Sequence, residues 1–300
     1  MALAVEHVHH FDMGTWLLFF AYLTSVVGSI VGLACTVQAR FASTSRAGIG
    51  WLALAAMSIG GVGIWLMHFI AMLGFTTPGN PVRYDIPRTA LSAVMSVGAV
   101  FLGLLVFGIR GRFALWRLLV AGAITGLAVA LMHYTGMWAV QIQGTIGYST
   151  GLVLLSVGIA VVAATAALWF TVAVDRVVLR VVAGLIMGFA VTGMHYTGMA
   201  AVQVRLDADA AAPAGVEVFS FLFPVFVLAA VALAVPITAV LLAPPRTEVA
   251  FVPAPVADEQ TGAPGDVVPA DDERAGMDEP GGVATPPATP PVTPVAPLRS

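Results

Sequence analysis

Charged residues are scarce in this 300-residue chain. They make up 10% of the sequence, whereas 59% of the residues are hydrophobic and the mean hydropathy is +0.95. Soluble domains contain about 25% charged residues. A composition this apolar excludes most soluble enzyme classes, and the length leaves room for roughly six to eight membrane-spanning helices.

Lysine is absent, because all 13 basic residues are arginine. Without lysine, retinal has no Schiff-base partner and a P-loop has no phosphate-binding ammonium, so a rhodopsin and a P-loop enzyme are both excluded. The single cysteine, Cys35, excludes an internal disulfide and a multi-cysteine metal site, and we expect it to be a buried apolar residue. No serine or threonine has a paired histidine and acid, so we expect no enzymatic activity.

The net charge of −3 combines two regions of opposite sign. Residues 1–243 contain 10 arginines and 7 acids, a net +3, whereas residues 244–300 contain 3 arginines and 9 acids, a net −6. Neither value favours nucleic acid as a partner. Residues 244–300 also hold 13 of the 19 prolines, so we expect a disordered cytoplasmic tail.

Long apolar runs dominate the rest of the chain. Each is long enough to cross the hydrocarbon and has no charged residue away from its ends, which predicts a transmembrane helix. The seven runs cover residues 13–37, 49–75, 89–109, 114–140, 151–174, 181–203 and 217–243. The sequence therefore predicts an all-α polytopic membrane protein built from repeated helical hairpins: a His-rich N-terminus (1–12), a seven-helix domain (13–243) and the tail (244–300). Pro224 and Pro236 are expected to kink the last helix.

The arginines predict the orientation in the membrane. With the N-terminus outside, eight arginines lie on the cytoplasmic side and three on the outer side. The eight are Arg40, Arg46, Arg110, Arg112, Arg117, Arg176, Arg180 and Arg246, and the three are Arg83, Arg88 and Arg205. The positive-inside rule therefore favours an N-out, C-in orientation. We expect a multi-pass protein of the plasma membrane. Asp12, Asp85 and Asp175 lie at helix borders, where we expect boundary or capping roles.

A hexapeptide recurs near the ends of the second, fourth and sixth runs. Its copies are MHFIAM at residues 67–72, MHYTGM at 132–137 and MHYTGM at 194–199. The histidines are 65 and 62 residues apart, which is two membrane crossings, so we expect all three copies in the outer leaflet at similar depth. Seven residues before each histidine stands a glycine, Gly61, Gly126 or Gly188, where we expect helices to approach closely.

Imidazole and thioether together form a ligand set that favours copper. In each copy the histidine and the methionine four residues later share a helical face, and the preceding methionine is offset by about 100°. The predicted ligands are His68, His133 and His195 with Met72, Met137 and Met199, and the alternates are Met67, Met132 and Met194. His10, in the N-terminal group with His7 and His9, is a further candidate. Hard oxygen-seeking ions are disfavoured, since the helix interiors contain no carboxylate.

The hexapeptide resembles the signature of the MHYT-domain family of integral membrane sensors of bacteria. Two copies contain M-H-Y-T and the first is degenerate, and the resemblance extends over residues 5–243. Further matching residues are His10-Phe11-Asp12, Gly61, Trp65 and the segment Arg83-Tyr84-Asp85-Ile86-Pro87. The resemblance implies a copper-binding sensor of a diatomic gas (oxygen, carbon monoxide or nitric oxide), in which Tyr134 and Tyr196 would hydrogen-bond a bound ligand or water.

Many members of that family continue into cytoplasmic cyclase, phosphodiesterase or kinase modules, whereas here only the tail follows. The resemblance therefore predicts a stand-alone form whose signal is read by a cytoplasmic partner in trans. Three alternatives stay open: a transporter of copper or another small solute, a haem protein with two axial histidines, and a scaffold in which histidine and tyrosine link helices. Whether the three histidines share one site is also open.

Overall fold

The computed structural model describes residues 15–77, 80–108, 113–207 and 209–243. Seven helices in these residues are long and apolar enough to cross a membrane, and each end lies within four residues of its predicted position. They are α1 (Trp16–Phe41), the continuous span α2–η1–α3 (Ser45–Ala56, Met57–Leu66 and Met67–Met72), α4 (Ile86–Phe107), α5 (Leu115–Trp138), α6 (Thr150–Ala173), α7 (Val177–Ala200) and α8 (Val218–Leu242). The predicted all-α membrane fold is confirmed.

Some predicted features lie outside the described residues. They are the N-terminal segment with Asp12 and with His7, His9 and His10, the loop arginines Arg110 and Arg112, and the tail from residue 244 with Arg246. Cys35 is fully buried, as expected. The N-out, C-in orientation stays a prediction.

Local sequence sets several helix ends. Asp85 caps α4 as predicted, because its carboxylate accepts a hydrogen bond from the backbone N–H of Arg88 at 2.9 Å. Gly108 ends the same helix with a φ of +70°, a left-handed conformation that glycine adopts without strain. Asp175, in the α6–α7 turn, forms an ion pair with Arg40 at the end of α1. These polar contacts lie at helix borders, where water or headgroups can reach them.

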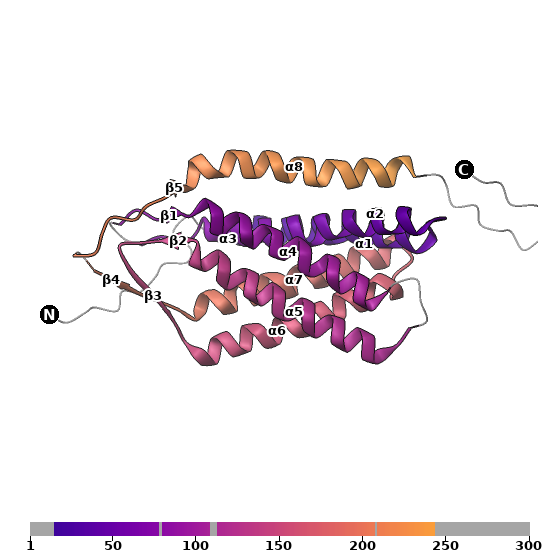
Figure 1. Cartoon of the computed structure of the whole chain (residues 1–300), viewed down its shortest axis with the longest axis horizontal. Helices are drawn as coiled ribbons and strands as arrows, with labels where there is room; N and C mark the ends of the chain where they lie inside the picture. Colours follow the sequence, from indigo (N-terminus) through magenta and orange to yellow (C-terminus); the bar gives the residue numbers. More distant parts are fainter. Residues whose placement is uncertain (1–14, 78–79, 109–112, 208, 244–300) are drawn as a thin grey trace, which may run out of the picture. The chain divides into compact units, whose positions relative to one another are not determined.

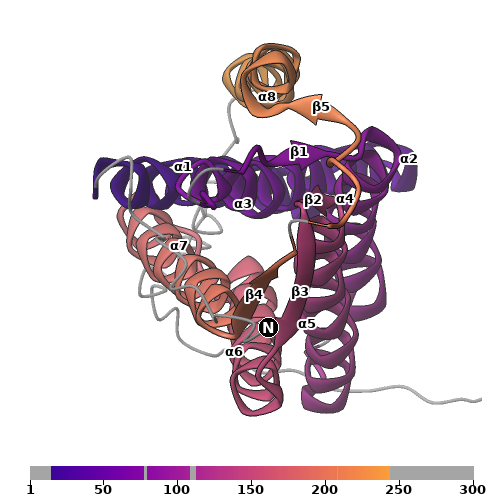
Figure 2. The same cartoon turned by 90° about the vertical axis from the view of Figure 1, so that its left-hand side faces the viewer.

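The first six spans form a ring in which each packs against the next one along the chain, and α7 closes the ring against α1. Figure 2 shows this arrangement from the end at which the strands lie. The last helix, α8, stands outside the ring and packs on η1 and α1. It continues through Pro224 and Pro236. The ring therefore consists of three consecutive helical hairpins, and α8 is an addition to one side of it.

The second span departs from a regular α-helix, since Met57–Leu66 is π-helical. Two α4 hydroxyls hold this segment: Ser96 donates to the Gly60 carbonyl oxygen at 2.7 Å, and Ser92 accepts from the Trp65 indole N–H at 3.0 Å. A π-helix has more residues per turn than an α-helix. Residues before it are therefore shifted in register relative to the other two repeats.

The shift explains the one glycine prediction that was wrong. A Cβ on Gly126 would overlap the Val161 backbone, and one on Gly188 would overlap Val26, so both mark close helix contacts as predicted. In the second span the close contact falls on Gly60, against the Ser96 backbone, whereas Gly61 has only an ordinary contact with a Val97 methyl. The π-helix has moved the contact by one residue.

Five short strands, which the sequence analysis did not predict, lie at one end of the bundle (Figure 1). We call this the motif end, because the three hexapeptides end there. The strands are β1 (Arg83–Tyr84), β2 (Val140–Gln141), β3 (Gly144–Tyr148), β4 (Val202–Leu206) and β5 (Val216–Glu217). β1 pairs antiparallel with β2 and β5, and β3 pairs antiparallel with β4. They tie together the loops that follow the three motif-bearing spans.

Candidate metal centre

The three motif histidines meet inside the six-helix ring. His68 belongs to α3, His133 to α5 and His195 to α7. The Nδ1 atom of His68 lies 3.0 Å from Nδ1 of His195 and 3.2 Å from Nδ1 of His133. No side chain of the three is more than 1% exposed. They form the one group of potential metal ligands of this kind among the described residues, so the three histidines share one site, which we call the His triad.

The triad is close to threefold symmetric. The centroids of the three imidazoles are 5.0, 5.0 and 5.2 Å apart, and the interplanar angles are 77–85°. Each imidazole also packs edge-on against the aromatic ring of the next residue, with centroid distances of 5.1 Å to Phe69, 4.9 Å to Tyr134 and 5.0 Å to Tyr196. The three hairpins therefore present the motif in equivalent positions around a common axis.

Protons alone do not satisfy three converging Nδ1 atoms. A neutral imidazole carries one N–H, so His68 can donate from Nδ1 to one neighbour and not to both. The Nε2 atoms of His68 and His133 are buried and have no hydrogen-bond partner among the described residues. With the protons on Nε2, three lone pairs point at each other, and a central cation would accept all of them.

Two of the imidazoles each pack against a glycine from the next copy of the motif. A Cβ on Gly136 would lie 2.5 Å from Nε2 of His68, and a Cβ on Gly198 would lie 2.5 Å from Nε2 of His133. Real Cβ atoms are essentially never this close to another heavy atom, so only glycine leaves room for the ring. The corresponding residue of the first copy is Ala71. This role was not predicted from the sequence, although glycine at the fifth position of two copies is its signal.

The arrangement fits a first-row transition metal. Two nitrogens bound to one ion at about 2.0 Å and at a tetrahedral angle are about 3.3 Å apart, close to the observed 3.0 and 3.2 Å. Imidazole suits copper and zinc, whereas calcium and magnesium prefer oxygen. Haem does not fit, because a macrocycle between two axial histidines needs a gap that Nδ1 atoms 3.0 Å apart do not leave.

The six motif methionines are all buried, at no more than 3% exposure. Met72, Met137 and Met199 follow the histidines by one turn, toward the motif end. Met67, Met132 and Met194 directly precede the histidines. The helical spans thus place two thioethers within one turn of each imidazole. Which of these sulfur atoms act as ligands stays a prediction.

The two predicted tyrosines have different surroundings. The Tyr134 hydroxyl forms a 2.7 Å hydrogen bond with Ser156 of α6. Its ring also packs edge-on against Tyr148 at 5.5 Å, and burial, with Tyr134 nearby, raises the pKa of Tyr148 to about 12. Tyr196 borders a surface groove between α1 and α7, together with Tyr22 and Phe189. Their proposed role in binding a ligand or water stays a prediction.

Aromatic side chains and strands cover the triad at the motif end. Phe69 packs on Trp65 at 4.9 Å and on Tyr84 of β1 at 6.0 Å. Tyr84 is 2% exposed, and burial raises its pKa. At the edge of this layer, Arg88 lies 3.9 Å over the Trp138 ring. Figure 2, with the motif end toward the viewer, shows β1 and β2 crossing this end of the bundle.

Sequence comparison finds the same repeat in known families. The family "MHYT: Bacterial signalling protein N terminal repeat" matches residues 61–121, 126–184 and 188–250. Each match begins at one of the three glycines that stand seven residues before a motif histidine. The repeats recognised by comparison are therefore the three that supply the triad.

Three curated relatives come from two bacteria. MucR of Pseudomonas aeruginosa, a bifunctional diguanylate cyclase/cyclic di-GMP phosphodiesterase, is 36% identical over 63% of this chain and 28% of its own length. NbdA of the same species, a cyclic di-GMP phosphodiesterase, is 38% identical over 53% of the chain and 21% of its length. The signaling protein YkoW of Bacillus subtilis is 30% identical over 73% of the chain and 27% of its length. The chain thus spans about a quarter of the length of these relatives, and no solved structure is significantly similar to it.

Proposed function

Because the chain belongs to the MHYT family of bacterial signalling proteins, we propose that it is a multi-pass membrane sensor that binds copper through the His triad. The signal is a diatomic gas (oxygen, carbon monoxide or nitric oxide) or the redox state of the metal. The observation that carries the proposal is the convergence of three buried Nδ1 atoms, one from each repeat. The lipid bilayer is the surrounding partner, and the plasma membrane is the proposed location.

Copper held by the triad would supply a one-electron redox couple and could bind a small ligand. His68, His133 and His195 provide neutral nitrogen donors, and their edge contacts with Phe69, Tyr134 and Tyr196 fix the imidazole planes. The methionines, with Met72, Met137 and Met199 as the first candidates, provide thioethers that favour Cu(I). Burial keeps bulk water from the nitrogens, so binding a small ligand competes with little solvent.

A sensor agrees better with the interior of the bundle than a transporter does. Among the described residues, no acidic or arginine side chain is buried. Transporters that couple to protons place ionisable groups along the path, whereas the buried histidines all lie near one end of the bundle. This arrangement favours a triad that holds a ligand over one that passes it across the membrane.

The output is proposed to pass to a cyclic di-GMP signalling partner. The printed names of MucR and NbdA assign cyclic di-GMP enzymes to chains that contain a related membrane part. With the N-terminus outside, the motif end faces the outer leaflet and the opposite end faces the cytoplasm, where such a partner works. For the chain itself we propose sensing without enzymatic activity.

Metal content tests the copper site. The full chain, purified in detergent after expression with copper, is compared with the variant His68→Ala/His133→Ala/His195→Ala. We expect copper in the first and none in the second. X-ray absorption of the bound copper is expected to show nitrogen ligands at about 2.0 Å. Cys35→Ala is the matched control, since it removes the chain's single thiol, a soft donor outside the triad, and is expected to keep the metal.

Folding is checked on the same samples by size-exclusion chromatography and circular dichroism. If the triple variant is unfolded, His133→Gln serves in its place, because it removes one donor and keeps a polar side chain of similar length. Equal copper in the wild-type chain and in folded triad variants would overturn the proposal. If the chain retained zinc in preference to copper in a competition experiment, the proposed metal would become zinc and the proposed histidine ligands would stay the same.

A further inference from the structure

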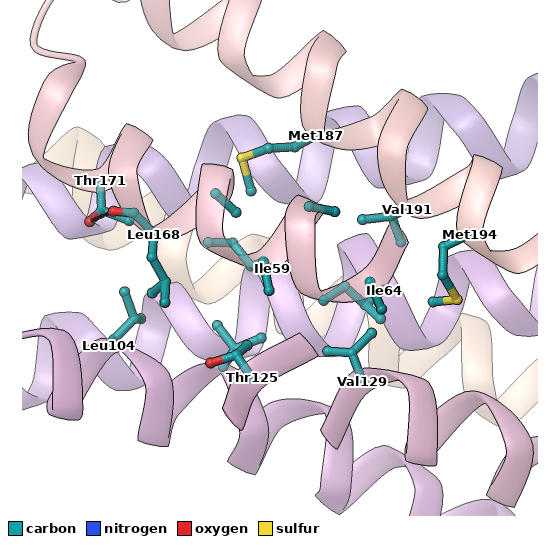
Figure 3. A pocket seen from close by; sticks show the side chains of 15 residues that line it. Ile59, Ile64, Leu104, Thr125, Val129, Leu168, Thr171, Met187, Val191 and Met194 are labelled. Carbon is teal, nitrogen blue, oxygen red and sulfur yellow. Dashed lines mark hydrogen bonds between the residues drawn. The ribbon is translucent and has the colours of Figure 1, made fainter. Parts of the chain in front are cut away.

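An apolar cavity of about 50 Å³ lies inside the bundle (Figure 3). Its lining residues in the motif-bearing spans precede the histidines in the chain, so it lies on the side of the triad away from the motif end. It is lined by residues of five elements: η1, α4, α5, α6 and α7. The lining includes Met194, which directly precedes His195 in the chain. The cavity therefore extends to a residue next to a triad histidine, but none of the three histidines lines it.

The cavity lies on the same axis as the triad. Ile64, Val129 and Val191 stand four residues before the three histidines, and all three line it. Four residues are about one helical turn, or about 6 Å along the axis. Two turns before the histidines, Thr125 and Met187 line it as well. The three repeats that bring the imidazoles together thus also enclose the space one to two turns away.

The π-helix controls which residue of the second span faces the cavity. The position equivalent to Thr125 and Met187 is Gly60, eight residues before His68. The residue that lines the cavity there is Ile59, because the π-helix shifts the register by one. An isoleucine side chain therefore forms the wall where regular α-helical spacing would place a glycine.

Small side chains leave the space open on one wall. Ala160, Ala163, Ala164 and Ala167 of α6 line the cavity at helical spacing. Ala160 is buried and the other three are half-buried. Methyl groups there do not reach the side chains of the facing helices, so the volume stays unfilled by protein.

The lining does not suit water. A cavity of this size exceeds the roughly 10–15 Å³ that one water requires, but a buried water also needs two to four polar partners. Thr171 already donates its hydroxyl to the Leu168 carbonyl oxygen at 2.6 Å. Thr125 also lines the cavity (Figure 3), but its hydroxyl oxygen is buried against Gly103 of α4. The lining therefore offers a water too few partners and fits a small apolar molecule.

We propose that this cavity is a binding site for one uncharged molecule of diatomic size, held by apolar contacts. Binding at this site needs no copper. Its meaning for signalling rests on the proposed function, because a gas molecule stored here lies one turn from the metal that would sense it. Through Met194 and Val191, an occupant contacts the segment that positions His195.

Xenon tests the site on metal-free, full-length protein. Apolar cavities that are empty of water bind xenon, and Met187 and Met194 each place a methyl group on the wall. With ¹³C-methyl-labelled methionine, we expect a saturable xenon-induced shift of the Met187 and Met194 signals in the NMR spectrum. Carbon monoxide at increasing pressure is expected to give saturable shifts of the same two signals.

Two leucine substitutions on α6 provide the matched comparison. Ala164→Leu adds side-chain volume to the cavity wall, and we expect loss of both shifts. Ala166→Leu adds the same volume on the same helix, at a residue that does not line the cavity, and is expected to keep them.

Three results would overturn the proposal. They are the absence of a saturable xenon shift in the wild-type chain, equal shifts in Ala164→Leu and the wild type, and contacts of the Met187 and Met194 methyls with detergent acyl chains before xenon is added. The last result would show that a lipid chain occupies the space. Because copper is absent throughout, failure here is separate from failure of the copper site.

Discussion

The second and sixth spans carry the same motif and supply the same ligand, yet they are built differently. The second, Ser45–Met72, is π-helical over Met57–Leu66, and 61% of its 18-residue apolar stretch is buried within the protein. The sixth, α7, is α-helical throughout, and 33% of the corresponding stretch is buried. At the triad they are equivalent, so symmetry is kept at the site and lost in the helix that leads to it.

The difference coincides with the place where α8 packs. α8 contacts η1, and Leu228 and Ala229 of α8 line a pocket with Met57, Gly61 and Trp65 of that segment. The fifth, sixth and fourth spans have no such added helix among the described residues. A span that serves both the triad and α8 has two packing surfaces, and the π-helix lies in the segment that α8 contacts.

The largest difference between an α-helical and the π-helical span is expected when one residue is deleted from each. Removal of Gly126 from α5 rotates the preceding part of the helix by about 100° relative to His133, so we expect loss of copper and destabilisation by about 3 kcal/mol or more. Removal of Gly61 takes out the additional residue of the π-helix, and the copper site is expected to survive. Copper content and thermal unfolding of both variants measure the difference. Equal losses would show that the π-helix is required as it stands.

The glycines that pack against the imidazoles give the next largest effect. Gly136→Ala and Gly198→Ala each place a methyl group against Nε2 of a triad histidine, and overpacking of this kind costs about 1–3 kcal/mol. We also expect weaker copper binding, since the imidazole must move. Ala71→Gly, at the same position of the first copy, is expected to cost less than about 1 kcal/mol. Unfolding in mixed micelles and copper competition titrations compare the three variants. A larger effect at Ala71 would contradict the role of Gly136 and Gly198 in leaving room for the imidazoles.

The smallest effect is expected at the hydroxyl that holds the π-helix. Ser96→Ala removes the 2.7 Å hydrogen bond to the Gly60 carbonyl oxygen, and such bonds between membrane helices contribute about 0.6 kcal/mol each. Tyr134→Phe removes a bond of the same length between α5 and α6 and serves as the control. Both lower the unfolding temperature slightly, and Ser96→Ala alone should change the tryptophan fluorescence, because Trp65 lies in the π-helix. Identical spectra for the two variants would argue against this role of Ser96.

Much of the fold and the identity of the site follow from the sequence. The bilayer requires each apolar run to satisfy its own backbone, so hydropathy alone located all seven spans. The repeated hexapeptide identified His68, His133 and His195, and the two-crossing spacing put them at one depth. The same reasoning selected Gly126 and Gly188 as helix contacts, since nothing disturbs the α-helical period in those spans.

The remainder depends on contacts that periodicity does not encode. Whether the three histidines adjoin was open because spacing along the chain does not fix which helices are neighbours; the packing of α7 on α1 decides it. The π-helix moved the contact from Gly61 to Gly60 because Ser92 and Ser96 of α4 bind that segment. The strands at the motif end are two to five residues long, too short for an alternating pattern to show.

Closure of the ring between the first and sixth spans has a consequence for biosynthesis. The chain enters the membrane from its N-terminus, so α1 and His68 are inserted while α7 has not yet left the ribosome. A nascent chain holds one and then two of the three imidazoles, and α1 has no partner on one side until the last repeat arrives. The complete site therefore forms only after α7 has inserted, and any metal that it takes must be delivered to the six-span ring.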